Sequence, residues 1–299
     1  MIVVTGANGN LGRQLLRELS GRQAVRGVVR SKRAAAQIKA LDLIPEPEIR
    51  VVDYLDQAAM NSALAGASHV VHLVGILKEA SHNSYADAHQ NSSRVLCAAA
   101  REAGVDRIIY LSILGSHPDS PNECLASKGA AEGLLMQAAT PALVVRVPMV
   151  LGPGDYASAA LGRRAKKRWS VLLRASSYEQ PIYAGDVIQA IISGIGSRGL
   201  DDVAVDLAGP TSLSRGDLIR RAAAMLGRST RVVSLPLGIG LAFVSILERL
   251  LVNPAVTRAM LEVLDHDDRI DPEPGRRLLG IELTRLDVTL AKCLEDSSV

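Results

Sequence analysis

Short apolar runs alternate with longer mixed stretches along the first 150 residues of the chain. The runs contain four to seven residues and predict strands, which cover residues 2–5, 24–30, 49–53, 69–74, 107–112 and 142–147. The stretches between them are rich in Ala and Leu and predict helices over residues 11–20, 31–41, 56–65, 85–103 and 125–138. Strands that are apolar throughout indicate a parallel sheet covered on both faces. The βαβα order predicts right-handed crossovers and therefore an α/β fold with a doubly wound, Rossmann-type parallel sheet.

The alternation loosens after about residue 150. There the pattern predicts a helix that ends near residue 197, a strand over 203–207 and a helix over 214–226. The remainder is mainly helical, and its breaks and helix ends are marked by Pro236, Pro254, Pro272, Pro274, Gly227 and Gly280. We therefore predict two parts: residues 1–150 hold the sheet, and residues 151–299 form a smaller, mainly helical lobe packed on the sheet edge.

Aromatic residues are scarce, with one Phe, one Trp and six Tyr among 299 residues. The core must therefore be aliphatic, and a surface that stacks nucleic-acid bases is not expected, because stacking needs exposed rings. The net charge is only +3. Cys97, Cys124 and Cys293 are too scattered for a disulfide framework or a zinc site, so no metal is expected. Since no signal peptide and no apolar stretch of about 18 residues is found, a cytoplasmic location is expected.

A candidate phosphate-binding loop follows the first predicted strand directly. Its glycines are spaced G-x-x-G-x-x-G in the segment Gly6, Ala7, Asn8, Gly9, Asn10, Leu11 and Gly12. Gly6 permits a tight turn, Gly9 lets the backbone approach a pyrophosphate, and Gly12 allows close packing of helix on strand. The helix N-terminus then offers N–H groups and a positive dipole end. A glycine-rich turn without a ligand is the alternative, but the position in the first βα unit favours a dinucleotide.

The end of the second predicted strand bears on the choice of dinucleotide. An acidic residue there would bind the ribose 2′-hydroxyl of NAD, whereas this chain has Arg30 followed by Ser31, Lys32 and Arg33. A guanidinium can pair with a 2′-phosphate. We therefore predict NADP(H) in preference to NAD(H), and we interpret Lys32 and Arg33 as the solvated start of a helix.

The glycine spacing resembles that of the extended and atypical branches of the short-chain dehydrogenase/reductase superfamily. Its members typically combine a Ser with a Tyr-x-x-x-Lys motif, in which the Tyr transfers a proton and the Lys lowers the pKa of that phenol and holds the nicotinamide ribose. The resemblance assigns these positions to Ser112, Lys128 and Cys124, with Cys124 standing where the Tyr is expected.

Cys124 cannot reach the place of a phenol hydroxyl, because its thiol ends one bond beyond Cβ. Two interpretations stay open: Lys128 lowers the pKa of the thiol and supports redox or covalent chemistry, or Cys124 is buried and inert. In either case Lys128 can still hold the ribose hydroxyls. We therefore expect a retained cofactor site in which hydride transfer of the usual kind is weakened or absent.

The resemblance implies further cofactor contacts. In the related families an Asp at the end of the third strand faces the adenine amino group, and this position corresponds to Asp53, with Tyr54 beside it. A turn carboxylate is the alternative for Asp53, and Asp56 is the better helix cap. The other implied positions, along the adenine ribose and beside the nicotinamide, are Leu73, Val74, Gly75, Pro148 and Val150.

Longer segments resemble, in order, the NAD(P)-binding accessory subunit family of respiratory complex I and its bacterial NmrA-like relatives. They include RVPMVLGPGD at 146–155 and QPIYAGDVIQAI at 180–191, and together they cover nearly the whole chain. The resemblance implies tightly held NADPH with a structural or regulatory role, and association with quinone-linked membrane machinery. His is frequent in that family at the position of His89, for which a structural role is the alternative. A Tyr is common there at the position of Cys124.

Two segments bear on partners. Arg163, Arg164, Lys166, Lys167 and Arg168 precede Trp169 and can dock on anionic lipid or an acidic protein, with a solvated helix face as the alternative. Residues 236–252 predict an apolar helix that suits a membrane interface or a partner, with core packing as the alternative. The expected cytoplasmic location therefore extends to a peripheral position at the inner face of the membrane.

Three functions are compatible with these features. The first is an NADP(H)-binding protein with a degraded active site that assembles, senses or stabilises a redox complex. The second is an active NAD(P)H-dependent oxidoreductase or epimerase that acts on a quinone-like molecule or a nucleotide sugar through Ser112 and Lys128. The third is an interaction protein without a cofactor. We predict the first.

Overall fold

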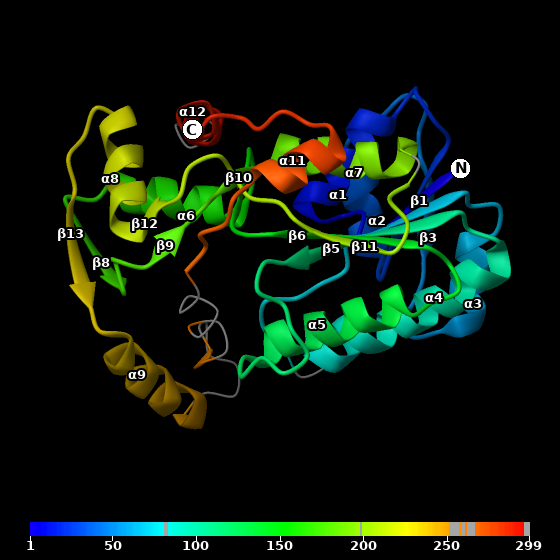
Figure 1. Ribbon diagram of the computed structural model, residues 1–299, viewed down its shortest axis with the longest axis horizontal. Coiled ribbons are helices and arrows are strands. Elements are labelled where there is room, and N and C mark those ends of the chain that lie inside the picture. Colours follow the sequence, from blue (N-terminus) through cyan, green and yellow to red (C-terminus); the bar gives the residue numbers. More distant parts are fainter. Residues whose placement is uncertain (81–82, 198, 251–256, 259–260, 262–266, 296–299) are drawn as a thin grey trace. The chain divides into compact units, whose positions relative to one another are not determined.

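The computed structural model describes residues 1–80, 83–197, 199–250, 257–258, 261 and 267–295 (Figure 1). The chain divides into two compact units. The first comprises Met1–Arg146 and Ile188–Val205, and the second comprises Val147–Val187 and Asp206–Val299.

A seven-stranded sheet of order β11-β6-β5-β4-β1-β2-β3 forms the centre of the first unit. Its strands are β1 (Ile2–Thr5), β2 (Val25–Val29), β3 (Glu48–Val51), β4 (His69–His72), β5 (Arg107–Ile113), β6 (Ala142–Val147) and β11 (Val203–Asp206). β1 pairs in parallel with both β2 and β4, and the β2–β3 and β4–β5 pairs are also parallel. The chain runs outward from β1 to β3 and then returns to β4. The carboxyl ends of β1 and β4 therefore flank the switch point, where ligands of such sheets bind. The predicted Rossmann-type fold is confirmed.

Helices cover both faces of this sheet. They are α1 (Asn10–Leu19), α2 (Lys32–Lys39), α3 (Gln57–Leu64), α4 (Ser92–Ala103), α5 (Glu123–Met136) and α7 (Ala184–Gly196), with a π-helical turn, η1 (Ala86–Asn91), before α4. Figure 1 shows α3, α4 and α5 on one face and α1 and α7 on the other. Side chains of Ser31, Asp56 and Asn122 accept hydrogen bonds from the first turns of α2, α3 and α5. These caps fix where the helices begin.

The core of the first unit is aliphatic, as the composition predicts. Val3, Val70 and Ile108, from three adjacent strands, are fully buried in one cluster with residues of α3, α4 and α5. Short aliphatic side chains suit a sheet covered on both faces, since every strand position must fit beneath a helix. Tyr54 and Tyr110 are the aromatic exceptions within this cluster.

Residues 188–205 belong with the first unit, although the sequence places them in the C-terminal lobe. Arg107, at the start of β5, explains why. Its guanidinium donates to the carbonyls of Gly194 and Ser197 at 2.8 and 2.7 Å and to the Asp201 carboxylate at 2.9 Å. These bonds, together with the pairing of β11 on β6, tie the end of α7 and the strand after it to the sheet.

In the part of the chain that the structure describes, the second unit combines helices with three two-stranded sheets. The helices are α6 (Tyr156–Ala165), α8 (Arg215–Met225), α9 (Leu237–Leu250), α11 (Glu273–Leu279) and α12 (Leu286–Glu295). The strands pair as β7 (Val150–Leu151) with β10 (Ile182–Tyr183), β9 (Tyr178–Glu179) with β12 (Leu213–Ser214), and β8 (Trp169–Leu173) with β13 (Arg231–Leu235). Leu161, Leu172, Leu218 and Leu290 bring α6, β8, α8 and α12 into one apolar cluster.

Several local expectations can be compared with these elements. The predicted helix over 85–103 is divided, because η1 precedes α4. Gly280 ends α11 in the left-handed conformation, and Gly227 adopts the same conformation just after α8. Pro236 directly precedes α9, whereas Pro254 and the end of the apolar stretch over 236–252 lie outside the described residues. Within the described part of the chain, none of the helices has the length and apolar character needed to cross a bilayer.

Candidate functional site

The candidate phosphate loop joins β1 to α1, and close backbone contacts require its glycines. Gly6 has a φ of +68°, and a Cβ there would lie 3.0 Å from the backbone of Leu73. A Cβ on Gly12 would lie 2.7 Å from the carbonyl oxygens of Gly6 and Ala7. Gly9 is the N-cap of α1 and offers no side chain to the first turn, so the N–H groups of this turn suit an anion. The backbone cradle left by the missing Cβ atoms fits a dinucleotide pyrophosphate.

Tyr54 ties this loop to the sheet. Its hydroxyl accepts a hydrogen bond from the Gly6 amide at 2.9 Å and donates one to the Val28 carbonyl at 3.0 Å. Burial raises the pKa of Tyr54 to about 12, against the lowering effects of the Gly6 amide and the Arg30 charge. The hydroxyl of this predicted cofactor contact is therefore engaged by the protein itself, in holding the loop in place.

Arg30 follows β2 at the border of the same loop. Its guanidinium carbon lies 5.9 Å from the centre of the Tyr54 ring, and Nη1 donates to the Asn83 side chain at 2.9 Å. Both Lys32 and Arg33 are exposed in the first turn of α2, as the sequence predicts. Of these three cations, Arg30 is the one that lies against the Tyr54 ring. The Tyr54 hydroxyl in turn bonds to Gly6 in the glycine loop.

Asp53 makes a local turn in this structure. Its carboxylate accepts from the Leu55 amide at 3.0 Å, while Asp56 accepts from the Ala59 amide at 3.0 Å as the predicted cap of α3. The turn interpretation of Asp53 therefore has a hydrogen bond in its favour. Its role toward an adenine amino group stays a prediction.

Lys128 extends from α5 to the ends of β4 and β5. The buried Nζ donates to the Leu111 carbonyl at 2.9 Å and lies 4.4 Å from the centre of the Tyr110 ring. A Cβ on Gly75 would lie 3.2 Å from this nitrogen. Burial lowers the pKa of Lys128 to about 8, against the raising effects of Cys124 and Glu132. The amine thus stands at the edge of the sheet where the sequence predicts a ribose.

Ser112 is brought to the same place by β5. It follows Leu111, the acceptor of Lys128, and its buried hydroxyl donates to the Ser116 hydroxyl at 3.4 Å. The structure therefore places the predicted Ser and Lys next to each other at the end of β5.

Cys124 lies one helical turn before Lys128 and is fully buried. Its thiol donates to the Ile76 carbonyl at 3.6 Å. Burial, opposed by Lys128, raises the pKa of Cys124 to about 11. A thiol with this pKa is protonated at neutral pH and is a poor nucleophile, which favours the interpretation of Cys124 as unreactive.

The π-helical turn η1 supplies a buried His next to these groups. His89 Nε2 accepts from the Ile76 amide at 3.0 Å, so Nδ1 carries the proton and donates to Ser127 Oγ at 2.7 Å. Ser127 in turn donates to the Cys124 carbonyl at 2.8 Å. Burial lowers the pKa of His89 to about 3, so the ring is neutral at pH 7. π-Helical turns often occur at functional sites, and this one aims His89 inward.

Tyr85 is a neighbour of this site that sequence reasoning did not single out. Its ring stacks on His89 with centroids 5.8 Å apart, and its hydroxyl donates to the Leu77 carbonyl at 2.9 Å. Burial and the nearby Cys124 raise the pKa of this phenol above its usual value. The spacing in the sequence could have indicated this contact, because Tyr85 lies four residues before His89 and therefore on the same helical face.

Two predicted contacts lie outside this unit. Pro148 and Val150 fall in the second unit, and their place beside a nicotinamide stays a prediction. The described residues contain no group of three or more His, Cys, Asp and Glu side chains that could hold a metal ion.

Comparison with known proteins identifies the family to which the chain with this glycine loop belongs. A family model described as NAD(P)H-binding matches residues 6–167, more than half of the chain. Subunit 9 of the mitochondrial NADH dehydrogenase [ubiquinone] 1 alpha subcomplex from Arabidopsis thaliana is 26% identical over 253 residues, which cover 80% of this chain and 61% of that protein. The ceramide reductase of Caulobacter vibrioides is 29% identical over 242 residues, covering 79% of this chain and 74% of the enzyme. The chain thus spans less than two thirds of the length of the first of these relatives.

A solved structure shows the same fold over nearly the whole chain. The NADPH-dependent quinone oxidoreductase of Escherichia coli in complex with NADPH superposes with a TM-score of 0.76 at 20% identity, covering 97% of this chain and 99% of that one. Together with the glycine cradle and the match of the family model, this fold assigns the chain to a family: it belongs to the NAD(P)H-binding family.

Proposed function

We propose that this protein holds NADP(H) as a structural or sensing cofactor and stabilises or helps to assemble a redox complex, with hydride transfer of the usual kind weakened or absent. The observation that carries the proposal is the state of Cys124. A buried thiol with a raised pKa, donating to the Ile76 carbonyl, stands where related enzymes place a phenol that transfers a proton. The glycine loop, Arg30 and Lys128 support retention of the cofactor site.

Each of those parts has a role toward the dinucleotide. The backbone of the glycine loop and the first turn of α1 bind the pyrophosphate. Arg30 pairs with the 2′-phosphate, exchanging its bond to Asn83 for a charge-assisted one, and this favours NADPH over NADH. Lys128 holds the ribose hydroxyls next to Ser112. When bound, the dinucleotide supplies a hydride donor, but Cys124 offers no proton at the position where a substrate oxygen would need one.

The relatives support the role in a complex. The Arabidopsis relative is a subunit of NADH dehydrogenase, and this chain matches it over 253 residues. Bound cofactor stabilises a folded unit by mass action, so the same dinucleotide can report on redox state and hold the fold together.

A second candidate function is an active reductase, and one observation favours it. The pKa of Lys128 is lowered to about 8, so its ammonium can release a proton near neutral pH without help from a phenol. Two relatives carry the names ceramide reductase and quinone oxidoreductase 2. In this alternative Lys128 delivers the proton and Ser112 orients the oxygen of a quinone-like or other carbonyl substrate.

Two measurements on the full chain separate these functions. Calorimetry with NADPH and NADH should show binding, with NADPH the tighter ligand. NADPH oxidation should stay at background with a panel of quinones and nucleotide sugars. Turnover by the unmodified protein would overturn the proposal in favour of the reductase, and absence of dinucleotide binding would overturn both.

The variant Cys124→Tyr tests whether the site lacks a proton donor because Cys124 stands at this position. Cys124→Ser is the matched control. Because Tyr is larger than the buried Cys, NADPH binding is measured first to establish that each variant folds. Gain of turnover in Cys124→Tyr alone would support a missing proton donor. If the unmodified protein shows turnover and Cys124→Tyr abolishes it, the idea of a missing proton donor is contradicted.

A further inference from the structure

The second unit carries a basic and apolar surface that the cofactor site does not use. It is formed by α6, the turn after it, and the two parallel strands β8 and β13, and we call it the α6–β8 face. The segments that build it, residues 156–173 and 228–235, contain no Asp or Glu. They contain seven cations: Arg163, Arg164, Lys166, Lys167, Arg168, Arg228 and Arg231. Because the whole chain has a net charge of only +3, the rest of it is net negative.

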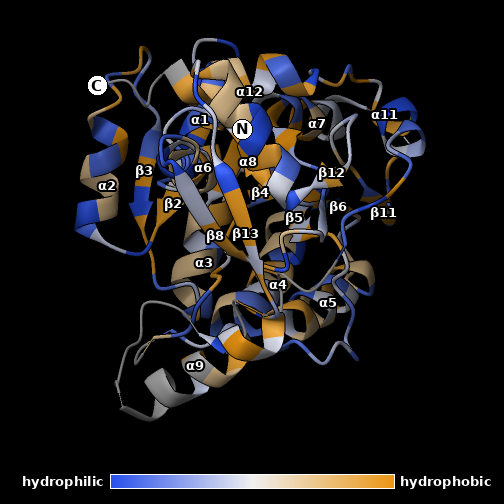
Figure 2. Ribbon diagram, turned by 90° about the vertical axis from the view of Figure 1, so that its left-hand side faces the viewer, coloured by the Kyte–Doolittle hydropathy of each residue, from blue (hydrophilic) through white to orange (hydrophobic). Residues whose placement is uncertain are grey.

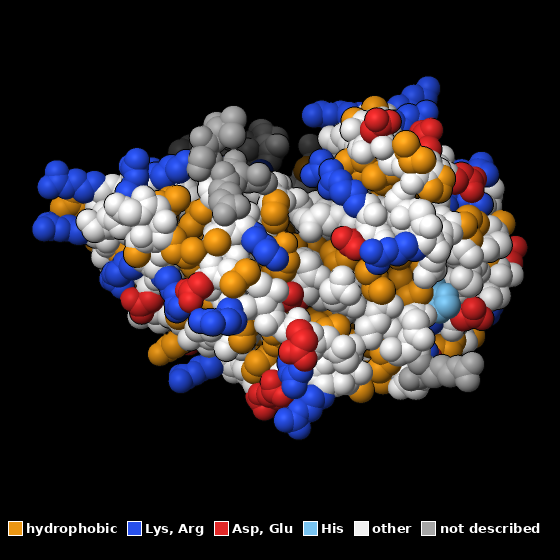
Figure 3. All heavy atoms as spheres, turned by 90° about the horizontal axis from the view of Figure 1, so that it is seen from above, with side chains coloured by type: hydrophobic (Ala, Val, Ile, Leu, Met, Phe, Trp, Pro, Cys, Tyr) orange, Lys and Arg blue, Asp and Glu red, His pale blue; other side chains and the backbone are white. Residues whose placement is uncertain are grey.

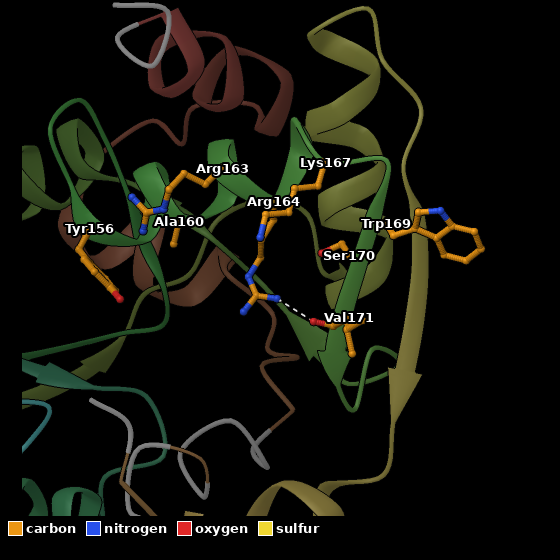
Figure 4. Close-up of a pocket in the computed structure, with 8 residues that line it drawn as sticks. All are labelled: Tyr156, Ala160, Arg163, Arg164, Lys167, Trp169, Ser170 and Val171. Carbon is orange, nitrogen blue, oxygen red and sulfur yellow. Dashed lines mark hydrogen bonds between the residues drawn. The ribbon is translucent and has the colours of Figure 1, made fainter. Parts of the chain in front are cut away.

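A pocket of about 460 Å³ opens on this face (Figure 4). Its lining comes from α6, β8 and the turn between them, and consists of Tyr156, Ala160, Arg163, Arg164, Lys167, Trp169, Ser170 and Val171. Arg164 Nη1 donates to the Val171 carbonyl at 3.0 Å, which holds the guanidinium across the pocket. Burial and the nearby Arg215 charge lower the pKa of Arg164, so an anion in the pocket would meet a partly desolvated cation.

Apolar side chains project outward beside this pocket. Along β8 the exposed Trp169 and Val171 alternate with the buried Ser170 and Leu172. In the register of the β8–β13 pair, Val171 lies opposite Val233. Trp169 is 52% exposed, Val171 54% and Val233 37%. Figure 2 shows β8 and β13 turned toward the viewer, with apolar positions along β13. The strands β8 and β13 therefore expose one apolar strip to solvent, formed by Trp169, Val171 and Val233.

Aromatic rings and cations are paired across the same face. The Arg231 guanidinium lies 5.2 Å from the centre of the Trp169 ring, and the Arg163 guanidinium lies 5.9 Å from the Tyr156 ring. Tyr156 is 78% exposed. Figure 3 shows the molecule from above, with basic, acidic and apolar side chains on the surface. The α6–β8 face thus combines exposed Trp and Tyr rings, short aliphatic side chains and charges of one sign.

We propose that the α6–β8 face docks on a bilayer that contains anionic phospholipids, with a lipid phosphate in the pocket between Arg163, Arg164 and Lys167. The cations match the negative surface potential of such a bilayer. Trp and Tyr rings favour the headgroup level, where one edge is wet and the other apolar, and Val171 and Val233 add apolar area below them. An acidic protein would also match the charge, and its binding is one outcome of the test below. The proposal concerns the second unit and does not depend on the function proposed for the first.

Vesicle co-sedimentation of the full chain tests the proposal. Vesicles of phosphatidylcholine with about 30% phosphatidylglycerol are compared with vesicles of phosphatidylcholine alone, at low salt and at about 0.15 M salt. We expect binding to the anionic vesicles only, weakened by salt but retained. Equal binding to both kinds of vesicle, or none to anionic vesicles at low salt, would overturn the proposal.

Paired variants locate the surface. Arg163→Gln with Lys167→Gln should weaken vesicle binding about thirtyfold, since each cation near an anionic surface contributes a factor of about five. The matched control is Lys39→Gln with Arg101→Gln, which removes the same charge from exposed positions of the first unit and should change binding by less than about twofold. Trp169→Ala, with the charge unchanged, should weaken binding about tenfold. If the control pair loses as much binding as the Arg163 and Lys167 pair, the effect is one of net charge and the proposed site is wrong.

Two further arms distinguish other ligands. Millimolar glycerol 3-phosphate should not displace the protein from vesicles, because it lacks the bilayer that Trp169 and the valines need. Polyglutamate should not bind more tightly than anionic vesicles. A protein that binds glycerol phosphate or polyglutamate but fails to sediment with vesicles has a site for a soluble anion or an acidic chain, and the membrane proposal fails. Circular dichroism of each variant confirms that a loss of binding is not a loss of fold.

Discussion

His89 Nδ1 lies 2.7 Å from Ser127 Oγ, and this buried bond joins η1 to α5 beside the predicted ribose site. The Ile76 amide fixes the tautomer by donating to Nε2, and the Ser127 hydroxyl donates a hydrogen bond to the Cys124 carbonyl. Three hydrogen bonds in series thus connect the loop after β4 to the helix that carries Lys128. The relationship assigns His89 a positioning role next to the cofactor site.

Replacing His89 should therefore destabilise the first unit. His89→Leu leaves the partly buried Ile76 amide without its acceptor and removes the bond from Nδ1 to Ser127, which keeps its own bond to the Cys124 carbonyl, so we expect a loss of about 1–3 kcal/mol. Urea denaturation followed by circular dichroism measures the loss. The control is His117→Leu, at a His whose side chain is 68% exposed. Equal free energies of unfolding for His89→Leu and the unmodified protein would show that the hydrogen-bond series does not contribute.

The same substitution should change how stability depends on pH. The pKa of His89 falls from 6.5 to about 3 on folding, because burial disfavours the charged ring. Between pH 6.5 and about 3, His89 therefore binds a proton in the unfolded state but not in the folded state. The free energy of unfolding falls as the pH falls through this range. His89 contributes about 1.4 kcal/mol of this loss for each pH unit in that window. The free energy of unfolding should fall less steeply with decreasing pH in His89→Leu; parallel curves would contradict the assignment.

Removing the Tyr54 hydroxyl should loosen the phosphate loop. In Tyr54→Phe the Gly6 amide and the Val28 carbonyl lose their shared partner, while the buried ring stays in place. We expect a loss of about 1–3 kcal/mol in stability and weaker NADPH binding, because the loop must be ordered when the ligand arrives. Thermal denaturation with and without NADPH measures both. Tyr156→Phe, at a phenol exposed in the second unit, should change neither quantity.

Arg30 should distinguish the two dinucleotides. Arg30→Ala removes the proposed partner of the 2′-phosphate, so NADPH affinity should fall by about tenfold to a hundredfold while NADH affinity changes little. Arg33→Ala removes the same charge from the exposed first turn of α2 and serves as the control. If both variants lost NADPH affinity equally, Arg30 would not be the residue that selects NADPH. If the unmodified protein bound NADH more tightly than NADPH, the predicted preference for NADPH would be wrong.

Lys128 should be needed for tight cofactor binding. In Lys128→Met the side chain keeps its bulk under Gly75, but the bond to the Leu111 carbonyl and the charge over Tyr110 are lost. A charge-assisted hydrogen bond contributes about 1.5–3 kcal/mol, so NADPH affinity should fall about tenfold to a hundredfold. Calorimetry measures it, and unchanged NADPH affinity in a folded variant would remove Lys128 from the site.

The order of the elements and the glycine loop could be predicted because both depend on local pattern. Unbroken apolar runs mark buried strands, and β1 and β6 begin and end at the predicted residues. Gly9 and Gly12 are required by contacts within a single β-turn-α unit, where a Cβ would meet the backbone of Gly6 or Ala7, whereas a Cβ on Gly6 would meet the backbone of Leu73 after β4. Asp56 as a cap and Lys32 as a helix start likewise depend only on adjacent residues.

Only the tertiary structure decided how distant groups act on one another. The return of residues 188–205 to the sheet depends on Arg107, some 90 residues earlier, and the Tyr54 clamp joins positions 48 residues apart. The pKa values of Cys124, Lys128 and His89 shift because packing removes water from all three at once, and burial depends on every neighbouring element rather than on local sequence. The sequence by itself determined that a Cys stands at position 124, where the resemblance implies a Tyr. Folding decided that its thiol lies buried, protonated and bonded to Ile76, because desolvation outweighs the nearby charge of Lys128.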